Sequence, residues 1–302
     1  MKIKRSPLFY VGDKYKLMSQ LVELFPKEIN NYYEPFVGGG SSFLNVNAKK
    51  YIVNDIDTNI IKLHKFLSSY KDDFSKLIKQ IEKLIIHYKL SSSFLLNTEI
   101  PWELKKQFPK TYFAKYNKEA YLKLRTDFNK NQNKIELLYL LLIFGFNHMI
   151  RFNNSQQFNL PVGNVDFNKN VYQALDEYIK FMSAHNVTFE NKDYLKFLKN
   201  QKFNNNDFIY LDPPYLISFS EYNKLWNENK ERELYKYLDY LNSVGVKFGI
   251  SNITHHKGKE NQILLNWMTK YNVYEIKSNY ISRFNNKLKP NLREVYITNY
   301  EK

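Results

Sequence analysis

The stretch "YLDPPYLISF", Tyr210 to Phe219, begins as a β-strand and then stops at an acid, two prolines and a tyrosine. Proline cannot donate a hydrogen bond to a β-ladder, so the strand must end at Asp212. Neither Pro213 nor Pro214 has an N–H, and the stiff backbone leaves the Pro213 carbonyl pointing outward beside the Asp212 carboxylate. Two adjacent acceptors suit one donor with two hydrogens, such as an exocyclic amine, and Tyr215 offers a flat face for its ring. A plain Asp-Pro turn is the alternative, but it explains neither the second proline nor the tyrosine.

Further strand-like segments surround this one and are mostly separated by helical stretches. The last two are joined only by "ISRFNNKLKPNL", which has no helical pattern and therefore predicts an antiparallel pair. We expect an α/β fold with a Rossmann-like, mainly parallel seven-stranded sheet and a reversed C-terminal strand. In such sheets ligands bind at the carboxyl ends of the strands, where Asp212 is expected. The seven segments are residues 31–36, 50–57, 186–191, 207–212, 246–251, 271–280 and 293–300.

A glycine-rich turn, "EPFVGGGSS" at residues 34–42, follows the first of these strands. We expect it to lead into a helix and then into the strand "KYIVNDID", which makes a βαβ unit. Phe43 stands where a dinucleotide-binding fingerprint needs its third glycine, so a pyrophosphate cradle is disfavoured, whereas a nucleoside without phosphate is allowed. Asp55, at the end of the next strand, is placed to accept hydrogen bonds from two ribose hydroxyls. It is equally consistent with a turn acid or a helix N-cap.

The middle of the chain is different in pattern and in charge. From Lys62 to Lys134 the apolar spacing is helical, and 16 basic residues stand against 7 acidic ones, a net of +9. The whole chain of 302 residues carries +15, so about a quarter of it holds more than half of the excess. We expect a catalytic domain at 1–61 and 170–302 and an inserted helical target-recognition domain with a basic face at 62–169. Helices are also expected at 14–25 and, as a buried one, over the apolar run at 137–146.

The positive charge favours a polyanionic partner, most simply nucleic acid. A Lys- and Asn-rich composition inherited from an AT-rich genome is the alternative, although it would not concentrate the charge in one segment. There are no cysteines, which excludes disulfides, thiolate nucleophiles and sulfur-based zinc sites. The sequence shows no apolar run long enough to span a membrane and no signal peptide, so a cytoplasmic protein without a membrane partner is expected. The histidines show no metal spacing, and no metal site is expected.

The motifs in their order resemble one enzyme family. "FYVGDKYKL" near the start, then "EPFVGGGS", the insert and finally "DPPY" are similar to the Dam-type (D12 class, α group) adenine-N6 DNA methyltransferases that use S-adenosylmethionine. The resemblance spans most of the chain, although the insert matches poorly and Asp13 stands where the family usually has glycine. It implies a bacterial or phage enzyme that methylates a flipped-out adenine in double-stranded DNA. A modification enzyme with a restriction endonuclease encoded nearby is expected, as a monomer or weak dimer.

The resemblance also implies which residues form the sites. Asp212, Pro213, Pro214 and Tyr215 are expected to be catalytic, with Asp212 and the Pro213 carbonyl accepting the two amino hydrogens and Tyr215 stacking on the base. Residues expected around the cofactor, with Asp193 near its adenine, are Tyr10, Gly12, Lys14, Glu34, Pro35, Phe36, Gly38, Gly40, Ser41, Ser42, Asp55, Ile56, Asp193, Tyr194 and Asp212.

The segment "FNHMIRFNNSQQFNLPVG", residues 146–163, is similar to the family's target-recognition element. Arg151 can bond a guanine bidentately, and Asn or Gln can do so with adenine, although a solvated loop would read much the same. His148 and Met149 stand where enzymes specific for GATC usually have Gly-Leu, which leaves the target sequence open. Residues expected to contact DNA are Asn147, Arg151, Asn153, Gln157, Asn159 and Pro161, with Lys105, Lys106 and Lys110 on phosphates.

Four other kinds of protein are weighed as alternatives. RNA adenine methyltransferases usually have asparagine at the position of Asp212, and protein glutamine methyltransferases likewise favour Asn-Pro-Pro-Tyr. A non-catalytic, basic nucleic-acid-binding protein would need no cofactor pocket, so cofactor binding separates it from an enzyme. An NAD-dependent oxidoreductase is disfavoured by the interrupted glycine fingerprint.

Overall fold

A computed structural model describes residues 2–218, 226–277 and 292–301. The chain forms two compact units. The first, here called the helical unit, consists of Met1–Asp13, Gly38–Leu44 and Asp57–His185. The second, here called the sheet unit, consists of Lys14–Val37, Asn45–Ile56 and Asn186–Lys302. These divisions differ from the predicted boundaries, because residues 1–13, 38–44 and the whole helix at 169–184 pack within the helical unit.

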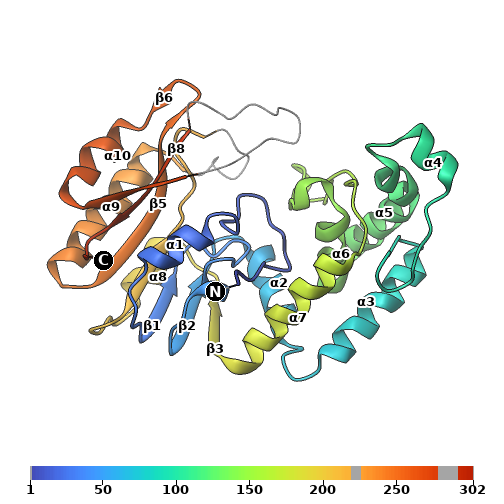
Figure 1. Ribbon diagram of the computed structural model, residues 1–302, viewed down its shortest axis with the longest axis horizontal. Coiled ribbons are helices and arrows are strands. Elements are labelled where there is room, and N and C mark those ends of the chain that lie inside the picture. The colour runs from blue at the N-terminus through green and yellow to red at the C-terminus, as the bar shows by residue number, and fades with distance from the viewer. Residues whose placement is uncertain (1, 219–225, 278–291, 302) are drawn as a thin grey trace. The chain divides into compact units, whose positions relative to one another are not determined.

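The sheet unit is built on a sheet of strand order β3-β2-β1-β4-β5-β8-β7 (Figure 1). The first five strands along this path are parallel, and β8 is antiparallel to both β5 and β7. A short β6 pairs with the end of β5. The predicted mainly parallel sheet with a reversed C-terminal strand is confirmed. The bounds are β1 Asn31–Glu34, β2 Lys50–Asn54, β3 Asn186–Glu190, β4 Phe208–Leu211, β5 Lys247–His256, β6 Lys259–Glu260, β7 Asn272–Ile276 and β8 Arg293–Thr298.

One face of this sheet is covered by α8 (Tyr194–Lys199), α9 (Glu228–Ser243) and α10 (Gln262–Trp267) (Figure 1). Their apolar side chains form one cluster with alternate residues of the strands, because successive side chains of a strand point to opposite faces. Glu231 of α9 is fully buried and accepts hydrogen bonds from Trp226, Tyr235 and Asn261. These neutral donors satisfy the carboxylate and join the start of α9 to the start of α10.

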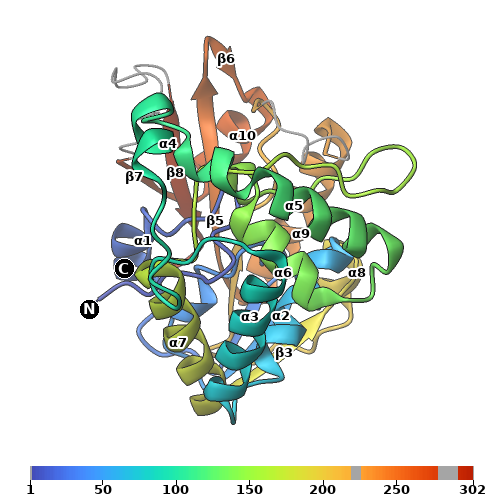
Figure 2. The ribbon, with the colours of Figure 1, turned by 90° about the vertical axis from the view of Figure 1, so that its right-hand side faces the viewer.

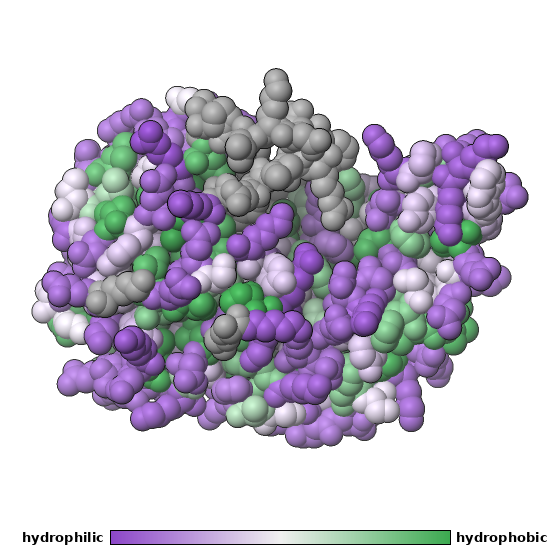
Figure 3. Space-filling model, in the orientation of Figure 1, coloured by the Kyte–Doolittle hydropathy of each residue, from purple (hydrophilic) through white to green (hydrophobic). Residues whose placement is uncertain are grey.

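The opposite face of the sheet is aromatic. Phe25, which follows α1 (Met18–Leu24), lies with its ring centroid 5.1 Å from those of Phe208 and Tyr210 and 5.7 Å from that of Tyr296. Gly249 of β5 has to be glycine, because a Cβ there would lie 1.8 Å from the Tyr296 hydroxyl. On the side of the molecule seen in Figure 3, hydrophobic residues form scattered patches among hydrophilic ones.

The helical unit contains α2 (Thr58–Ser68), α3 (Phe74–Tyr88), α4 (Trp102–Gln107), α5 (Tyr112–Lys130), α6 (Ile135–Phe144) and α7 (Lys169–Ala184) (Figure 2). The predicted buried helix is confirmed in α6, where every residue from Leu137 to Phe144 is buried. Tyr121 of α5 donates to the Leu141 carbonyl and is itself fully buried. Among the described helices, none combines the length and the apolarity needed to cross a membrane.

Two local predictions were wrong. The glycine turn leads into a single 3₁₀ turn, η1 (Phe43–Asn45), and no α-helix lies between β1 and β2. The connection, residues 35–49, is long enough to join parallel strands without one. The helix expected over 14–25 is confined to α1, so Lys14 precedes it. The end of the strand predicted at 271–280 lies outside the described residues.

Candidate active site

Asp212 follows the last residue of β4 at the carboxyl edge of the parallel strands. β4 is buried along its whole length and pairs with β1 and β5. Between β1 and β4 the order of strands along the chain reverses direction, and this is the point at which open α/β sheets bind ligands. The strand therefore carries the acid to the position that the sequence predicted.

Three side chains of the sheet unit, those of Lys14, Tyr215 and Glu294, gather around Asp212. The Lys14 Nζ lies 2.9 Å from Asp212 Oδ1 and 3.8 Å from Glu294 Oε1. The Tyr215 hydroxyl lies 3.2 Å from the same Asp212 oxygen and 3.1 Å from Glu294 Oε1. Lys14 also lies 4.8 Å from the centroid of the Tyr215 ring. Lys14 is 7% exposed and Glu294 3%, so water screens this cluster poorly.

Both contacts to Asp212 are made to one of its oxygens, Oδ1. Within the described chain, Oδ2 receives no hydrogen bond or ion pair. The carboxylate is therefore held on one side and presents an acceptor on the other. The use of Asp212 as an acceptor for an amine stays a prediction.

The hydroxyl of Tyr210, two residues before Asp212, is surrounded by several carboxylates at this edge of the sheet. Burial raises the pKa of its hydroxyl well above the ordinary value, and the carboxylates of Asp212, Glu34 and Glu294 raise it further. The hydroxyl lies 2.8 Å from Ser251 Oγ, which lowers the pKa. Burial also raises the pKa of Glu294, and Asp212 adds to the increase, whereas Lys14 and Tyr215 oppose it. Three carboxylates from three strands thus converge on one end of the sheet.

The ends of β1, β2 and β3 are fastened by one buried amide, that of Asn54. Its Nδ2 donates to the Pro35 carbonyl at 3.0 Å and to the Lys192 carbonyl at 2.9 Å, while its Oδ1 accepts from the Lys192 N–H. Glu34, at the end of β1, is buried and accepts from the Tyr32 hydroxyl. The predicted residues Glu34 and Pro35 therefore lie on a rigid strand end.

Asp55 and Ile56 follow directly after β2. The side chain of Asn191 donates to both of their carbonyls, at 2.8 Å and 3.1 Å. The N-cap of α2 is Asp57, whose carboxylate accepts from the Asn59 N–H. The alternative in which Asp55 caps the helix is therefore excluded. Ile56 is 59% exposed although it is large and apolar.

Three aromatic rings gather beside the end of β1. Phe36 stacks on Tyr194 with the ring centroids 5.2 Å apart, and Trp226 packs edge-on against Phe36. Asp193 caps α8 by accepting from the N–H groups of the two residues after Tyr194, and it pairs with Lys230 at 3.2 Å. Asp193 therefore has a structural role whatever else it contacts.

The predicted cofactor residues Tyr10, Gly12, Gly38, Gly40, Ser41 and Ser42 belong to the helical unit. Gly40 has a φ of +83°, and a Cβ there would lie 2.4 Å from Phe43 Cε1 and 2.9 Å from His64 Cε1. His64 is fully buried, with Nε2 2.9 Å from the Gly38 carbonyl and Nδ1 3.0 Å from the Tyr178 hydroxyl. Burial lowers the pKa of His64 to about 4, although the bond to Gly38 raises it. A neutral imidazole from α2 thus fixes the glycine loop.

The predicted recognition segment forms a hairpin-like loop after α6. Phe152 and Phe158 form an isolated antiparallel bridge, and the Asn153 side chain accepts from the Gln157 N–H. Arg151 donates from Nε to Asn159 Oδ1 and from Nη2 to the Asn159 carbonyl, both at 2.9 Å. The segment is therefore a loop with hydrogen bonds of its own. Asn147, Asn153, Gln157 and Pro161 are exposed, whereas Arg151 and Asn159 are partly buried.

The predicted phosphate contacts Lys105 and Lys106 lie on α4, and Lys110 lies in the turn after it. All three are exposed. Lys106 lies 5.1 Å from the ring centroid of Trp102, which is itself 65% exposed. These cations are available to a polyanion at the surface of the helical unit.

A comparison with protein families gives the geometry its context. The model of the D12 class N6 adenine-specific DNA methyltransferases matches residues 10–281. The chain belongs to this family. The predicted family and its fold are thereby confirmed.

Individual D12 relatives are named as modification methylases, type II methyltransferases and DNA adenine methylases. The chain is 37% identical to modification methylase StsI of Streptococcus sanguinis, over 99% of this chain and 43% of that protein. It is 35% identical to type II methyltransferase M.FokI of Planomicrobium okeanokoites, over 98% of this chain and 43% of that protein. The DNA adenine methylase of Escherichia coli K12 is 27% identical, over 71% of this chain and 66% of that protein. The chain thus spans less than half the length of the first two relatives.

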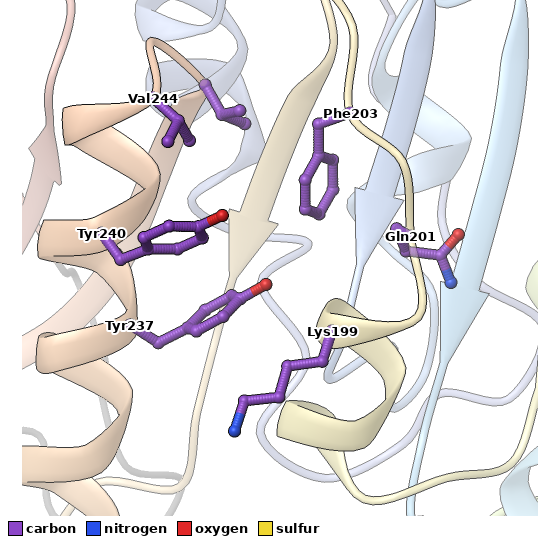
Figure 4. Close-up of a pocket in the computed structure, with 7 residues that line it drawn as sticks. Lys199, Gln201, Phe203, Tyr237, Tyr240 and Val244 are labelled. Carbon is purple, nitrogen blue, oxygen red and sulfur yellow. The ribbon is translucent and has the colours of Figure 1, made fainter.

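A hollow of about 590 Å³ lies elsewhere in this D12 sheet unit, at the amino ends of β4 and β5 (Figure 4). Tyr237 and Tyr240 project into it from α9, and Lys199 reaches it from the end of α8. It lies at the edge of the sheet opposite to Asp212, and no predicted site residue lines it.

Three residues around these D12 motifs were not predicted as site residues from the sequence. Glu294 and Asn54 were seen only as parts of strands, and His64 only as a structural or surface histidine. A polar residue at the last position of the apolar strand "KYIVN" was a usable signal for Asn54. Glu294 reaches Lys14 and Tyr215 from the far end of the chain, and a single sequence holds no signal for those contacts.

Proposed function

We propose that this chain transfers a methyl group from S-adenosylmethionine to N6 of adenine in double-stranded DNA. The observation that carries the proposal is the position of Asp212 at the switch point of the sheet, held through Oδ1 by Lys14 and Tyr215. Membership of an adenine-specific family supports the choice of base. Because the duplex hides N6, the adenine has to be flipped out of the stack.

In this proposal Asp212 Oδ2 and the Pro213 carbonyl accept the two hydrogens of the amine. Accepting both draws the nitrogen lone pair out of conjugation with the ring. The Tyr215 ring stacks on the base and holds its plane. The cofactor, when bound, supplies an activated methyl on a sulfonium, so the protein contributes orientation and fixed charge.

The residues of the sheet unit suit a nucleoside ligand. Asp55 offers a carboxylate at a strand end. The Phe36–Tyr194 stack offers apolar ring surface in the same unit. Asp55 would accept from the ribose hydroxyls, and Phe36, Ile56 and Tyr194 would border the adenine. Tyr10, Gly12, Lys14, Glu34, Pro35, Gly38, Gly40, Ser41, Ser42 and Asp193 complete the proposed set.

DNA binding is assigned to the helical unit. Lys105, Lys106 and Lys110 would contact phosphates, which supplies affinity without sequence preference. The 146–163 segment would read base edges, with Arg151 on a guanine and with Asn147, Asn153, Gln157, Asn159 and Pro161 around it. Together with 62–169 as the recognition domain, these assignments follow the predicted division of the chain.

We further infer a place in a restriction-modification system. The names of StsI and M.FokI, which describe modification and type II methyltransferases, support this assignment. The endonuclease would be encoded nearby, and no physical contact with it is required. A monomer or weak dimer is the expected state of the chain.

The decisive experiment offers the protein S-adenosylmethionine carrying a labelled methyl group and a mixed-sequence DNA duplex. We expect label in N6-methyladenine, and single-molecule sequencing of the product should locate it in one sequence context. RNA of the same sequence is the parallel substrate. Label in RNA alone would support the RNA methyltransferase, and DNA binding without cofactor binding by calorimetry would support a non-catalytic protein.

A further inference from the structure

Glu294 is a buried acid that none of the family motifs in the sequence includes. It lies near the start of β8, which runs antiparallel to β5, and is paired with Ile253 near the carboxyl end of β5. The reversal of β8 therefore brings an acid from the end of the chain to the carboxyl edge of the parallel strands. Val295 and Ile297 point into the apolar core on the other face, so Glu294 points toward the side of Asp212.

Glu294 contacts both groups that hold Asp212. Its Oε1 lies 3.1 Å from the Tyr215 hydroxyl and 3.8 Å from the Lys14 Nζ. The same hydroxyl and the same ammonium group lie 3.2 Å and 2.9 Å from Asp212 Oδ1. A buried charge is retained only where it is paired and hydrogen-bonded, and these two contacts meet that requirement.

We propose that Glu294 is a positioning residue for methyl transfer. It holds Lys14 and Tyr215 against Oδ1 of Asp212 and so keeps Oδ2 directed at the amine. The Tyr215 hydroxyl carries a single proton, so the two carboxylates share it, and Glu294 acts by keeping the hydroxyl and the Lys14 ammonium in place between them. Without Glu294, both groups lose their second partner and can shift away from Asp212 Oδ1, which lets the carboxylate rotate. The inference rests on the proposed function, because it assigns Asp212 to the amine.

The contacts of Glu294 predict which kinetic constants its substitution should change. Glu294 touches neither the base nor the cofactor in this proposal, and Lys14 lies closer to Asp212 than to Glu294. Its loss should therefore slow the chemical step far more than it weakens cofactor binding through Lys14. In Glu294→Gln the amide oxygen can still accept from Tyr215, but the charge facing Lys14 is gone. We expect kcat to fall 10- to 100-fold, with the dissociation constants for S-adenosylmethionine and DNA changed less than threefold.

The link through Tyr215 is tested by a double-mutant cycle on kcat. Tyr215→Phe removes the hydroxyl and leaves Glu294 in place. If Glu294 acts through that hydroxyl, the double variant should be no more than about twofold slower than the slower single variant. Effects of the two substitutions that multiply would overturn the proposal, as would an unchanged kcat or a loss confined to cofactor affinity.

Two controls complete the design. Glu275→Gln makes the same chemical change at an exposed position of the neighbouring strand β7 and should leave kcat unaltered. If Glu294→Gln does not fold, Tyr215→Phe alone must lower kcat without weakening cofactor binding. An unaltered kcat would then overturn the positioning role of Glu294. If the wild-type chain methylates no DNA, the proposed function fails. The contact between Glu294 and Tyr215 is then tested by measuring the free energy of unfolding of the same two single variants and the double variant. Additive effects would contradict the contact.

Discussion

Asp212 illustrates how a single acceptor can be oriented before a substrate arrives. Both of its contacts within the described chain are to Oδ1, one from an ammonium group and one from a hydroxyl. The two prolines that follow remove backbone donors that could otherwise compete for the carboxylate. In the proposed reaction, an acceptor fixed in this way would need little reorganisation when the amine approaches, which is how preorganised polar groups accelerate a reaction.

The first prediction concerns Asp212. Asp212→Ala should lower the methylation rate by well over tenfold and leave S-adenosylmethionine affinity nearly unchanged, because the carboxylate serves the amine. A residual rate within tenfold of wild type corresponds to a barrier change of no more than about 1.4 kcal/mol. Such a result, measured with saturating cofactor and DNA, would remove Asp212 from the proposed role.

Asp55 and Asp57 provide a matched pair of acids two residues apart. Asp55→Ala should weaken S-adenosylmethionine binding by about 1.5–3 kcal/mol, the value of hydrogen bonds to a charged group, and leave DNA binding in place. Asp57→Ala should instead lower the free energy of unfolding by about 0.5–2 kcal/mol, since Asp57 caps α2. Calorimetric titration and urea unfolding separate the two effects. Equal cofactor affinity in wild type and Asp55→Ala would make Asp55 a turn acid.

At the scale of helices and strands, the confirmed predictions are those based on a repeating pattern of apolar residues within one helix or one strand. The apolar run of α6 and the strands around "DPPY" are of this kind. The connection from β1 to β2 was predicted wrongly, because "GGGSSF" favours a turn into a helix and only the buried Phe43 and its neighbours reveal the 3₁₀ turn. The roles of His64, Asn54 and Glu294 were not predicted, because their partners lie on other elements far along the chain.

His64 links α2 to the glycine loop, and this link should depend on pH. The pKa of about 4 in the folded chain lies below the ordinary 6.5, so the unfolded chain binds the proton more readily. The stabilisation is therefore complete above about pH 6.5 and is lost as the pH falls toward 4, by up to about 3 kcal/mol. Urea unfolding of His64→Gln should show a flatter pH dependence than wild type across this range. His87→Gln, at an exposed histidine, is the control, and equal slopes for wild type and His64→Gln would contradict the assignment.

Arg151 belongs to the hairpin-like loop both structurally and, in the proposal, functionally. Its Nε and Nη2 are engaged by Asn159, which leaves other guanidinium N–H groups for a base. Arg151→Ala should raise the barrier to methylation by about 1–3 kcal/mol on the target sequence and by little on sequences in which one guanine is replaced. The variant should therefore discriminate less at that guanine. The measurement is the methylation rate on the target and on all its single-base variants. Equal slowing on every sequence would make Arg151 a residue that only shapes the loop or clamps a phosphate.

At the scale of the molecule, the excess of positive charge is concentrated in one segment of the helical unit. The +9 between Lys62 and Lys134 falls on α2 to α5 of the helical unit, while the acids that converge near Asp212 belong to the sheet unit. The net charge of the whole chain could not exclude a genomic bias, but the positions of the charged residues located the excess of positive charge within one segment. The boundaries of the compact units were beyond reach, since residues 1–13 and 38–44 join the helical unit through packing that no local pattern encodes.

The concentration of charge predicts how DNA affinity should respond to salt. Replacing Lys105, Lys106 and Lys110 together by glutamine should weaken binding to every DNA sequence alike. The slope of log affinity against log salt should fall by about 0.9 for each phosphate that is no longer neutralised, because fewer counterions are released on binding. The sequence preference of methylation should stay unchanged, in contrast to Arg151→Ala.

The matched control removes the same charge from the opposite edge of the sheet unit. Lys27, Lys49 and Lys50 are exposed at the amino ends of β1 and β2, away from the edge that carries Asp212. Their replacement by glutamine changes the net charge of the chain by the same amount as the substitutions around α4. If only the α4 variant has a shallower salt slope, local phosphate contacts are responsible. Equal weakening in both variants would mean that DNA responds to the overall charge of the molecule, and the assignment of a phosphate-binding surface to α4 would fall.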